Sequence, residues 1–145
     1  MRPILIPNLM VEDVVATVRF YQDILSYQLV VGVVTMAKGE SEYNFVTELT
    51  DEIMLDWANI KGDETEFMFQ SRESLGDEIP ALKDVPIGAS QTLYIRINDV
   101  DAHYAKCCDK VEVVAEPIDK FYGMREWYMK DNNGYILCFG QELSA

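Results

Sequence analysis

The stretch that decides the fold is MREWYMK-DNNG-YILCFGQ, residues 124–141, in which two runs rich in apolar residues flank a turn. Asp, Asn and Gly are typical of tight turns, because their backbones tolerate the conformations that such turns need. A type I turn over residues 131–134, with Gly134 as a left-handed bulge, pairs Asp131 with Tyr135. The stretch therefore predicts a β-hairpin of defined register.

The register decides which side chains share a face, because successive residues of a strand point to opposite sides of a sheet. One face then carries the predicted core residues Trp127, Met129, Leu137 and Phe139. On the other face, Glu126 opposes Gly140 and Tyr128 opposes Cys138. A looser loop would reverse the faces and turn Arg125 and Trp127 into a cavity. Two interpretations of Glu126 stay open, a pocket residue or an ion pair with Arg96 or Arg125.

The same order of elements is predicted twice along the chain. In the first half, we expect a strand at 4–10, a helix capped by Asp13, a strand at 27–35, a loop at 38–51 with a short extended piece, and hairpin strands at 53–60 and 64–70. In the second half, we expect a strand at 92–97, a helix capped by Asp99, a strand at 111–116 ended by Pro117, and the final hairpin.

Short matches between the halves support a duplication. VEDVVA at 11–16 aligns with INDVDA at 97–102, and FMFQ at 67–70 aligns with LCFG at 137–140. Residues 71–89 show no sustained period and contain Pro and Gly, which is typical of a connection. We therefore expect an α+β fold of two tandem β-α-β-β-β modules, residues 1–75 and 90–145, joined by a linker at 76–89 into one structural domain, because pairing buries their sheet faces.

Composition narrows the class of partner. The chain has 145 residues, 49% of them hydrophobic, with 12 basic and 25 acidic residues and a net charge of -13. This charge disfavours nucleic acids and anionic membrane surfaces as partners, since both require Lys and Arg. No segment approaches the roughly 20 apolar residues of a membrane helix. Three cysteines, an odd number, are typical of reduced thiols, and we expect a soluble cytoplasmic protein.

The run YGMREWYMKDNNGY at 122–135, the Phe20-Tyr21 pair and the NDVD helix start at 98–101 carry a resemblance. The chain resembles the vicinal oxygen chelate superfamily, which includes glyoxalase I, bleomycin-resistance proteins and extradiol dioxygenases, and within it the bleomycin-resistance-like branch. The resemblance implies two modules whose curved mixed sheets enclose a common pocket, and a homodimer. It also implies, for the enzymes of the superfamily, a divalent metal held by side chains on the first and fourth strands of each module, usually His and Glu.

The resemblance places these metal positions at Ile6, Met68, Thr92 and Cys138. Isoleucine cannot ligate, threonine is a poor ligand, methionine suits soft metals, and one thiolate does not make a site. We therefore expect no metal and no cofactor. A shift of the alignment by two residues leaves an alternative, oxygen-ligated site of Asn8, Glu66 and Gln70. The single histidine, His103, is expected on the surface of the second helix.

Strand alternation predicts the lining of the pocket. The predicted ligand-binding residues are Asn8, Trp57, Glu66, Met68, Thr92, Tyr94, Arg96, Glu126, Tyr128 and Cys138. Trp57 belongs there if Lys61-Gly62 forms a two-residue turn, and is otherwise a core residue. Carboxylates among aromatic rings favour a cationic or amine-bearing guest.

The sequence thus favours a metal-free small-molecule binding protein that sequesters a cationic or amphipathic drug-like compound, with Glu126 and Glu66 as charge anchors. Two enzyme hypotheses stay beside it. The first is a metal-dependent lyase, isomerase or dioxygenase with an atypical metal site. The second is a metal-free enzyme in which Glu126, its pKa raised by burial among rings, acts as a general base near Tyr128.

Overall fold

A computed structural model describes residues 1–144 of the chain. Contacts divide the protein into two compact units, Met1–Pro86 and a second unit that begins at Ile87. Each unit contains a mixed sheet with a helix against it, so the fold class is α+β, as predicted. The two β-α-β-β-β orders predicted from the sequence are both present, with additional elements in the first unit.

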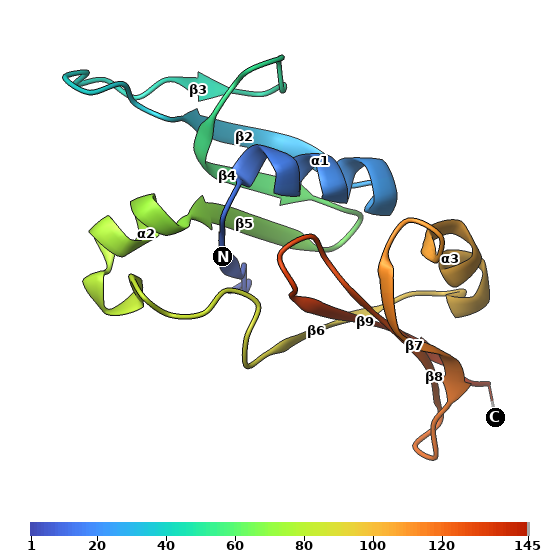
Figure 1. Ribbon diagram of the computed structural model, residues 1–145. Helices are drawn as coiled ribbons and strands as arrows, with labels where there is room; N and C mark the ends of the chain where they lie inside the picture. Colours follow the sequence, from blue (N-terminus) through green and yellow to red (C-terminus); the bar gives the residue numbers. More distant parts are fainter. Residues whose placement is uncertain (145) are drawn as a thin grey trace. The chain divides into compact units, whose positions relative to one another are not determined.

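The first unit has a five-stranded sheet of order β1-β5-β4-β2-β3. The strands are β1 (Asn8–Val11), β2 (Gln28–Val34), β3 (Phe45–Val46), β4 (Leu55–Lys61) and β5 (Glu66–Ser71). Strands β1 and β5 are parallel, and the other pairs are antiparallel. Helix α1 (Val14–Leu25) lies along this sheet (Figure 1). Strand β1 is shorter than the predicted strand at 4–10.

Helix α1 begins and packs as the sequence predicts. The carboxylate of Asp13 accepts a hydrogen bond from the backbone N–H of Ala16, which satisfies one free donor of the first turn. Val14, Val18 and Tyr21 recur at helical spacing and are buried against the sheet. The Tyr21 ring packs on Phe69 of β5, with 4.9 Å between the ring centroids.

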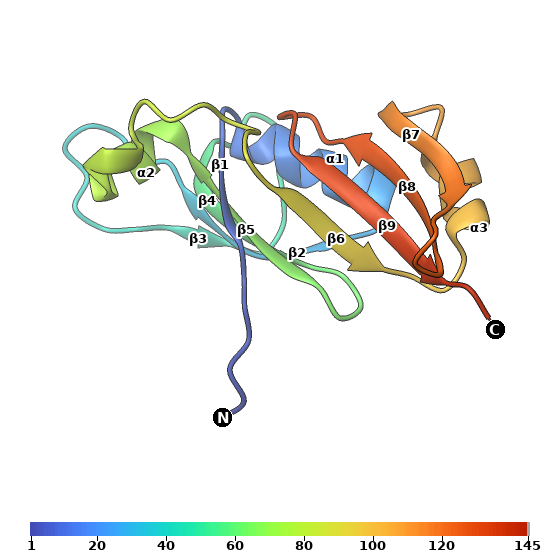
Figure 2. The same cartoon turned by 90° about the horizontal axis from the view of Figure 1, so that it is seen from below.

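The second unit has a four-stranded sheet of order β6-β9-β8-β7. Its strands are β6 (Thr92–Arg96), β7 (Glu112–Asp119), β8 (Met124–Lys130) and β9 (Ile136–Glu142). Figure 2 shows β6, β9 and β8 side by side, as the strand order requires. Helix α3 (Val100–Cys107) is capped by Asp99, which accepts from the backbone N–H of Ala102.

The predicted register of the β8–β9 hairpin is confirmed. The Asp131 N–H donates to the Tyr135 carbonyl at 2.9 Å, and Gly134 has φ +91°, in the left-handed region. Trp127 pairs with Phe139, Met129 with Leu137, Tyr128 with Cys138 and Glu126 with Gly140. The four predicted core residues of the hairpin are all buried.

The prediction that residues 71–89 are irregular is wrong for their first part. Helix α2 (Arg72–Glu78) follows β5 directly, and the 3₁₀ turn Pro80–Leu82 follows α2. Ser71 caps α2 by accepting from the backbone N–H of Ser74 at 3.2 Å. Only Leu75 and Gly76 of α2 are buried, so the helix is too short and too polar to produce a period in the sequence.

Two further predictions in the second unit are wrong. Strand β7 continues through Pro117, because β7 is the edge of the sheet and its pairing with β8 shifts register between Ala115 and Ile118, where no N–H is required. His103 is half-buried, not a surface residue. Its Nδ1 accepts from the Trp127 indole N–H at 3.1 Å, and burial, aided by Lys106, lowers its pKa.

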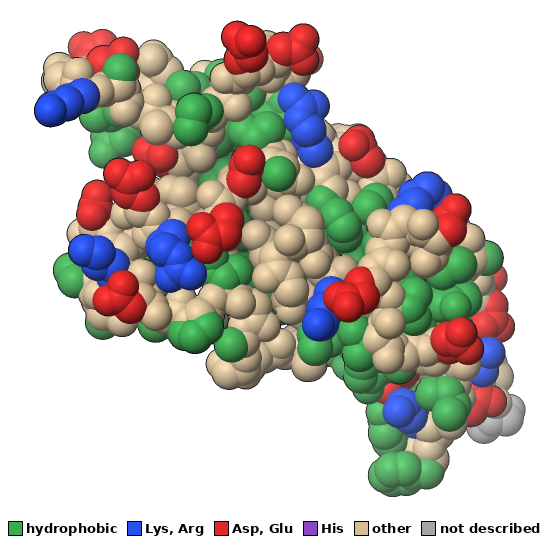
Figure 3. Space-filling view, in the orientation of Figure 1, with side chains coloured by type: hydrophobic (Ala, Val, Ile, Leu, Met, Phe, Trp, Pro, Cys, Tyr) green, Lys and Arg blue, Asp and Glu red, His purple; other side chains and the backbone are tan. Residues whose placement is uncertain are grey.

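The surface reflects the acidic composition. On the face shown in Figure 3, acidic side chains are spread widely and the Lys and Arg side chains are scattered. Within residues 1–144, no helix has the length and apolarity that crossing a bilayer requires.

Candidate functional site

A groove in the first unit has a volume of about 890 Å³. It is lined from all five strands of the sheet, from α2 and from the loop between β2 and β3. The lining is acidic and aromatic, with four carboxylates and three rings: Asp56, Glu73, Asp77, Glu78, Tyr43, Phe45 and Trp57. No Lys or Arg belongs to the described lining. Tyr43 and Phe45 are 65% and 66% exposed, so apolar surface is open beside the carboxylates.

A chain of amide hydrogen bonds fixes one wall of the groove. The Asn8 amide donates from Nδ2 to Oε1 of Gln70 at 3.0 Å. The Gln70 amide in turn donates from Nε2 to Oγ of Ser74 and to Oε2 of Glu78, both at 2.9 Å. Gln70 is buried, and its partners come from β1 and α2. The wall therefore keeps its shape before any ligand arrives.

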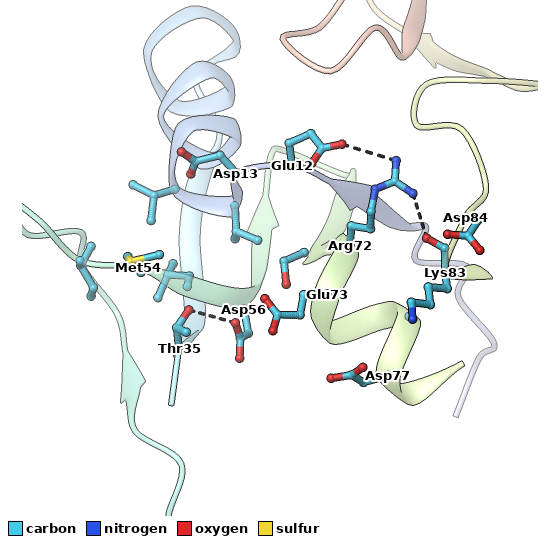
Figure 4. A pocket seen from close by; sticks show the side chains of 16 residues that line it. Glu12, Asp13, Thr35, Met54, Asp56, Arg72, Glu73, Asp77, Lys83 and Asp84 are labelled. Carbon is cyan, nitrogen blue, oxygen red and sulfur yellow. Dashed lines mark hydrogen bonds and ion pairs between the residues drawn. The ribbon is translucent and has the colours of Figure 1, made fainter. Parts of the chain in front are cut away.

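A second hollow of about 780 Å³ lies between the start of α1, β4 and α2 (Figure 4). It shares Asp56, Glu73 and Asp77 with the groove. Its lining includes Arg72, which lies 3.4 Å from the Glu12 carboxylate and donates to the Lys83 carbonyl at 3.0 Å. Unlike the described lining of the groove, the lining of this hollow has two basic side chains, Arg72 and Lys83.

In the second unit, a carboxylate is covered by tyrosines. Glu126 of β8 has no exposed surface. Its Oε2 accepts from the Tyr94 hydroxyl at 2.6 Å, and its Oε1 accepts from Tyr122 at 2.6 Å and from Tyr128 at 3.1 Å. We call Glu126, Tyr94, Tyr122 and Tyr128 the tyrosine–glutamate cluster. Three phenol donors replace the water that the carboxylate would otherwise bind.

Gly140 is what allows Tyr94 to reach Glu126. Gly140 lies on β9 between the two strands, paired with Arg96 of β6 and with Glu126 of β8. The Tyr94 phenol crosses β9 above the Gly140 α-carbon, where a Cβ atom would overlap its hydroxyl and ring. Any side chain at this position would therefore exclude the phenol.

The prediction of a raised pKa for Glu126 is wrong. Burial alone raises the pKa of this carboxyl, but the hydrogen bonds from Tyr122, Tyr94 and Tyr128, with Lys120 nearby, outweigh burial and lower it. The rings around Glu126 carry hydroxyls, so they act as donors rather than as an apolar wall. A carboxylate with a lowered pKa is a weak base, which argues against the general-base hypothesis.

The partners of Glu126 resist ionisation in turn. The hydrogen bond to Glu126, followed by burial, raises the pKa of Tyr122 to about 12. Burial, followed by Glu126, raises the pKa of Tyr94 as well. Burial and the Glu126 charge raise the pKa of the Cys138 thiol to about 11. At neutral pH the cluster is therefore one carboxylate surrounded by neutral donors.

The ion-pair interpretation of Glu126 is also wrong. Arg125 points to the other side of β8 and binds Asp101 at 2.9 Å and Asp119 at 2.8 Å. Arg96 is exposed on β6 and forms no ion pair within residues 1–144. The negative charge of Glu126 is stabilised by hydrogen bonds from phenols rather than by a basic side chain.

A family model matches residues 4–139, nearly the whole described chain. The chain belongs to the Glyoxalase/Bleomycin resistance protein/Dioxygenase superfamily. This match confirms the resemblance inferred from the sequence. No curated protein matches the chain.

Several solved structures share the fold of this chain. A glyoxalase/bleomycin resistance protein/dioxygenase from Nocardioides is 18% identical, with a TM-score of 0.69 over 100% of this chain and 87% of that chain. A protein of unknown function from Agrobacterium tumefaciens is 20% identical, with a TM-score of 0.65 over 99% and 96%. The bleomycin-binding protein of Streptomyces verticillus, solved with copper(II)-bleomycin, is 17% identical, with a TM-score of 0.56 over 100% of both chains.

The metal that enzymes of the superfamily use does not fit the residues of this chain. The Cys138 thiol lies beside the tyrosine–glutamate cluster and has a raised pKa, which disfavours a thiolate ligand. Both oxygens of Glu126 already accept hydrogen bonds from phenols. Across residues 1–144, no group of three or more His, Cys, Asp or Glu side chains could hold a metal ion. The alternative ligands Asn8 and Gln70 bind each other, and Glu66 lies 3.5 Å from Lys61.

Seven of the predicted ligand-binding residues belong to one of two sites, one in each unit, and three belong to neither. Asn8, Trp57 and Met68 line the groove of the first unit. Tyr94, Glu126, Tyr128 and Cys138 lie together in the second unit. Glu66 is paired with Lys61, away from the groove lining, and Thr92 and Arg96 are exposed on β6. The condition set for Trp57 is not met, because Gly62–Thr65 forms a longer loop, yet Trp57 still lines the groove.

Sequence reasoning missed Tyr122 and the acids of α2. Tyr122 precedes Glu126 by four residues in the run that carries the resemblance, but nothing in the sequence showed that the chain folds back there. Glu73 and Asp77 are four residues apart, the spacing that places two side chains on one helical face. Had α2 been predicted, that spacing would have indicated that Glu73 and Asp77 lie together on one face of the helix.

Proposed function

We propose that this protein binds a cationic, amphipathic small molecule in the groove of the first unit and releases it chemically unchanged. The observation that carries the proposal is the lining of the groove, four carboxylates and three aromatic rings without a Lys or Arg. The binding requires no metal. The proposed protein acts in the cytoplasm, because its three cysteines are typical of reduced thiols. It acts as a homodimer, because the superfamily resemblance implies one.

The charges of the groove support a cation as the guest. Glu73 and Asp77 lie on one face of α2, and neither forms an ion pair among the described residues. A cation between them replaces part of its hydration with carboxylate contacts, in a groove where water is partly excluded. The net charge of -13 also speeds the approach of a cation from solution.

The aromatic residues support an apolar, flat portion in the same guest. A cation over an aromatic ring gains about 0.5 to 2 kcal/mol, more where it is desolvated. Trp57, Tyr43 and Phe45 offer such rings together. The groove volume of about 890 Å³ falls within the range of drug-sized sites, roughly 300 to 1,000 Å³. The complex of the Streptomyces protein with copper(II)-bleomycin supports drug binding as a role for this fold.

The test compares two tricyclic probes of the same shape and opposite charge, 9-aminoacridinium and 9-anthracenecarboxylate. Their affinities are measured by fluorescence polarisation on the full chain. The expected result is binding of the cation and not of the anion. The double variant Glu73→Gln/Asp77→Asn should lower the affinity for the cation by about tenfold or more, which corresponds to about 1.4 kcal/mol of binding free energy.

A matched control keeps the total charge equal. Asp23→Asn/Glu48→Gln removes two exposed carboxylates of the same unit that do not line the groove. This control should change the affinity less than twofold. Equal losses in the two double variants would show that only the net charge matters and would overturn the groove as the site.

A further inference from the structure

The tyrosine–glutamate cluster holds a buried negative charge without a counter-ion. No Lys or Arg nitrogen within residues 1–144 lies at ion-pair distance from Glu126. Buried carboxylates are usually paired with a basic group or bound to a metal. Lys120 contributes a favourable charge but lies over the Tyr128 ring, 5.6 Å from its centroid. The cluster therefore remains negative and lacks a partner of opposite charge.

The direction of the hydrogen bonds determines what the cluster offers to solvent. An ionised carboxylate only accepts, so each phenol in contact with Glu126 must donate its single proton to it. A phenol oxygen keeps two acceptor lone pairs when its proton is committed. The outer side of the cluster therefore presents acceptors, close to a negative charge, and no free hydroxyl donors.

The phenols are open to solvent although the carboxylate is not. Tyr94 is 46% exposed and Tyr122 is 53% exposed, while Glu126 is fully buried. Phe121 is fully exposed, and its ring meets the Tyr122 ring edge-on with 5.1 Å between centroids. Apolar surface thus lies directly beside the acceptor oxygens. A molecule with an N–H-bearing cation at one end and an apolar body would match both.

We propose that Tyr94, Tyr122 and Tyr128, backed by Glu126, form a binding site for the primary ammonium group of an organic amine. The ammonium donates N–H bonds to the phenol oxygens and supplies the counter-charge that Glu126 lacks. The apolar body of the amine packs on Phe121. This site goes beyond the proposed function, because it lies in the other unit and shares no residue with the groove.

The recognition differs from a simple aromatic cage. Cation–π attraction requires only a positive charge, and it does not require the cation to carry an N–H group. The phenol acceptors require N–H donors. A primary ammonium and a quaternary ammonium with the same apolar body therefore separate the two kinds of recognition.

The test is an NMR titration of the full chain labelled with ¹³C at the tyrosine ε positions. The probes are benzylammonium, benzyltrimethylammonium and benzyl alcohol. Benzylammonium should shift the resonances of Tyr94, Tyr122 and Tyr128 in a saturable way, and the other two probes should bind at least about tenfold more weakly. Equal binding of the quaternary probe would overturn the proposal, as would saturable shifts confined to tyrosines outside the cluster.

Variants assign the effect to the cluster. Tyr122→Phe removes one acceptor oxygen from a half-exposed ring together with its hydrogen bond to Glu126, which keeps the hydrogen bonds from Tyr94 and Tyr128. Tyr122→Phe should lower the affinity for benzylammonium by about five- to tenfold, and Glu126→Gln should lower this affinity further. Tyr104→Phe is the matched control, because Tyr104 is on α3 and packs on Trp127, which faces away from Glu126. A loss in Tyr104→Phe equal to that in Tyr122→Phe would contradict the assignment.

Lys120 provides an opposite prediction. Its ammonium competes with the ligand for the field of Glu126, so Lys120→Met should tighten benzylammonium binding several-fold. Lys110→Met removes an exposed lysine that lies beside Asp109 and should leave the affinity unchanged. Weaker binding in Lys120→Met would contradict the proposed role of the Glu126 charge. The groove variants Glu73→Gln/Asp77→Asn should not change these tyrosine shifts, which keeps this test separate from that of the proposed function.

Discussion

Four strands pair in the same order in both units, with β3 added in the first, yet the two sheets present different chemistry. In the first unit, Asn8 of β1 pairs with Met68 of β5. In the second unit, Tyr94 of β6 pairs with Cys138 of β9 at the equivalent position. Asn8 and Tyr94 therefore start from corresponding places and reach different partners.

The residue two positions further along the last strand explains the difference. In the first unit this residue is Gln70. Its amide oxygen accepts a hydrogen bond from Asn8, so the Asn8 side chain stops at Gln70 and does not extend to the next strand. In the second unit it is Gly140, which leaves open space that the Tyr94 phenol crosses to bind Glu126. The side chain at this position therefore decides the chemistry of the sheet face. With Gln70 the face carries a chain of amide hydrogen bonds, and with Gly140 it carries a carboxylate covered by phenols.

The largest expected effect comes from closing that space. Gly140→Ala places a Cβ where the Tyr94 hydroxyl lies, so the phenol must leave Glu126. Losing a hydrogen bond to a buried charged group should lower the free energy of unfolding by about 2 kcal/mol. Chemical denaturation at pH 7 measures the loss.

A double-variant cycle identifies the cause. In a Tyr94→Ala background the overlap no longer exists, so Gly140→Ala should cost only a few tenths of a kcal/mol, about the range of an unremarkable substitution. A full cost in that background would mean that backbone effects at residue 140, rather than the Tyr94 contact, stabilise the strand.

A smaller effect is expected from removing the charge of Glu126. Glu126→Gln keeps the shape of the side chain, but its amide N–H₂ group faces a phenol that also donates. The free energy of unfolding is therefore expected to fall by about 1 kcal/mol at pH 7. The lowered pKa of Glu126 also makes native stability depend on pH. Its contribution is complete above the ordinary pKa of this carboxyl, 4.5, and is lost as the pH falls through the lower, folded value.

The variant should therefore lose stability less steeply than the wild type below about pH 4, and the two curves should converge there. Thermal unfolding between pH 2 and 7 measures this convergence. Glu116→Gln, on the exposed side of the edge strand β7, is the control and should parallel the wild type. Parallel curves for Glu126→Gln and the wild type would contradict the lowered pKa.

The smallest effect is expected in the first unit, where the amide wall has several partners. Gln70→Ala leaves the Asn8 amide and the Glu78 carboxylate without their shared partner, but both can reach water in the groove. The expected loss is about 1 kcal/mol or less. Binding of 9-aminoacridinium should weaken with it, because Glu78 is no longer held in place. An unchanged affinity would show that the wall is not needed for binding.

Much of this comparison could be predicted from the sequence. The Asp131–Gly134 turn fixed the register of β8 and β9, which placed Glu126, Tyr128 and Cys138 on one face and Trp127 on the other. The short repeat matched FMFQ with LCFG and so aligned Gln70 with Gly140. Local turn geometry and strand alternation are sufficient for such inferences, since both act over a few residues.

The rest depends on contacts that strand alternation does not encode. The pKa of Glu126 was predicted in the wrong direction, because the rings near it were treated as an apolar surrounding and the donor role of their hydroxyls was not used. Tyr122 reaches Glu126 from the loop after β7, whose path follows a register shift at the sheet edge. The acidic wall of the groove comes from α2, a helix too short to show a period.

The measurement that tests the account most directly is calorimetric titration of the wild-type chain with 9-aminoacridinium and with 9-anthracenecarboxylate at the same ionic strength. The account predicts at least about tenfold tighter binding of the cation, with an affinity that falls as salt is added, because carboxylates carry the recognition. Equal affinity for the two probes, or tighter binding of the anion, would contradict the claim that this protein is a receptor for cationic small molecules.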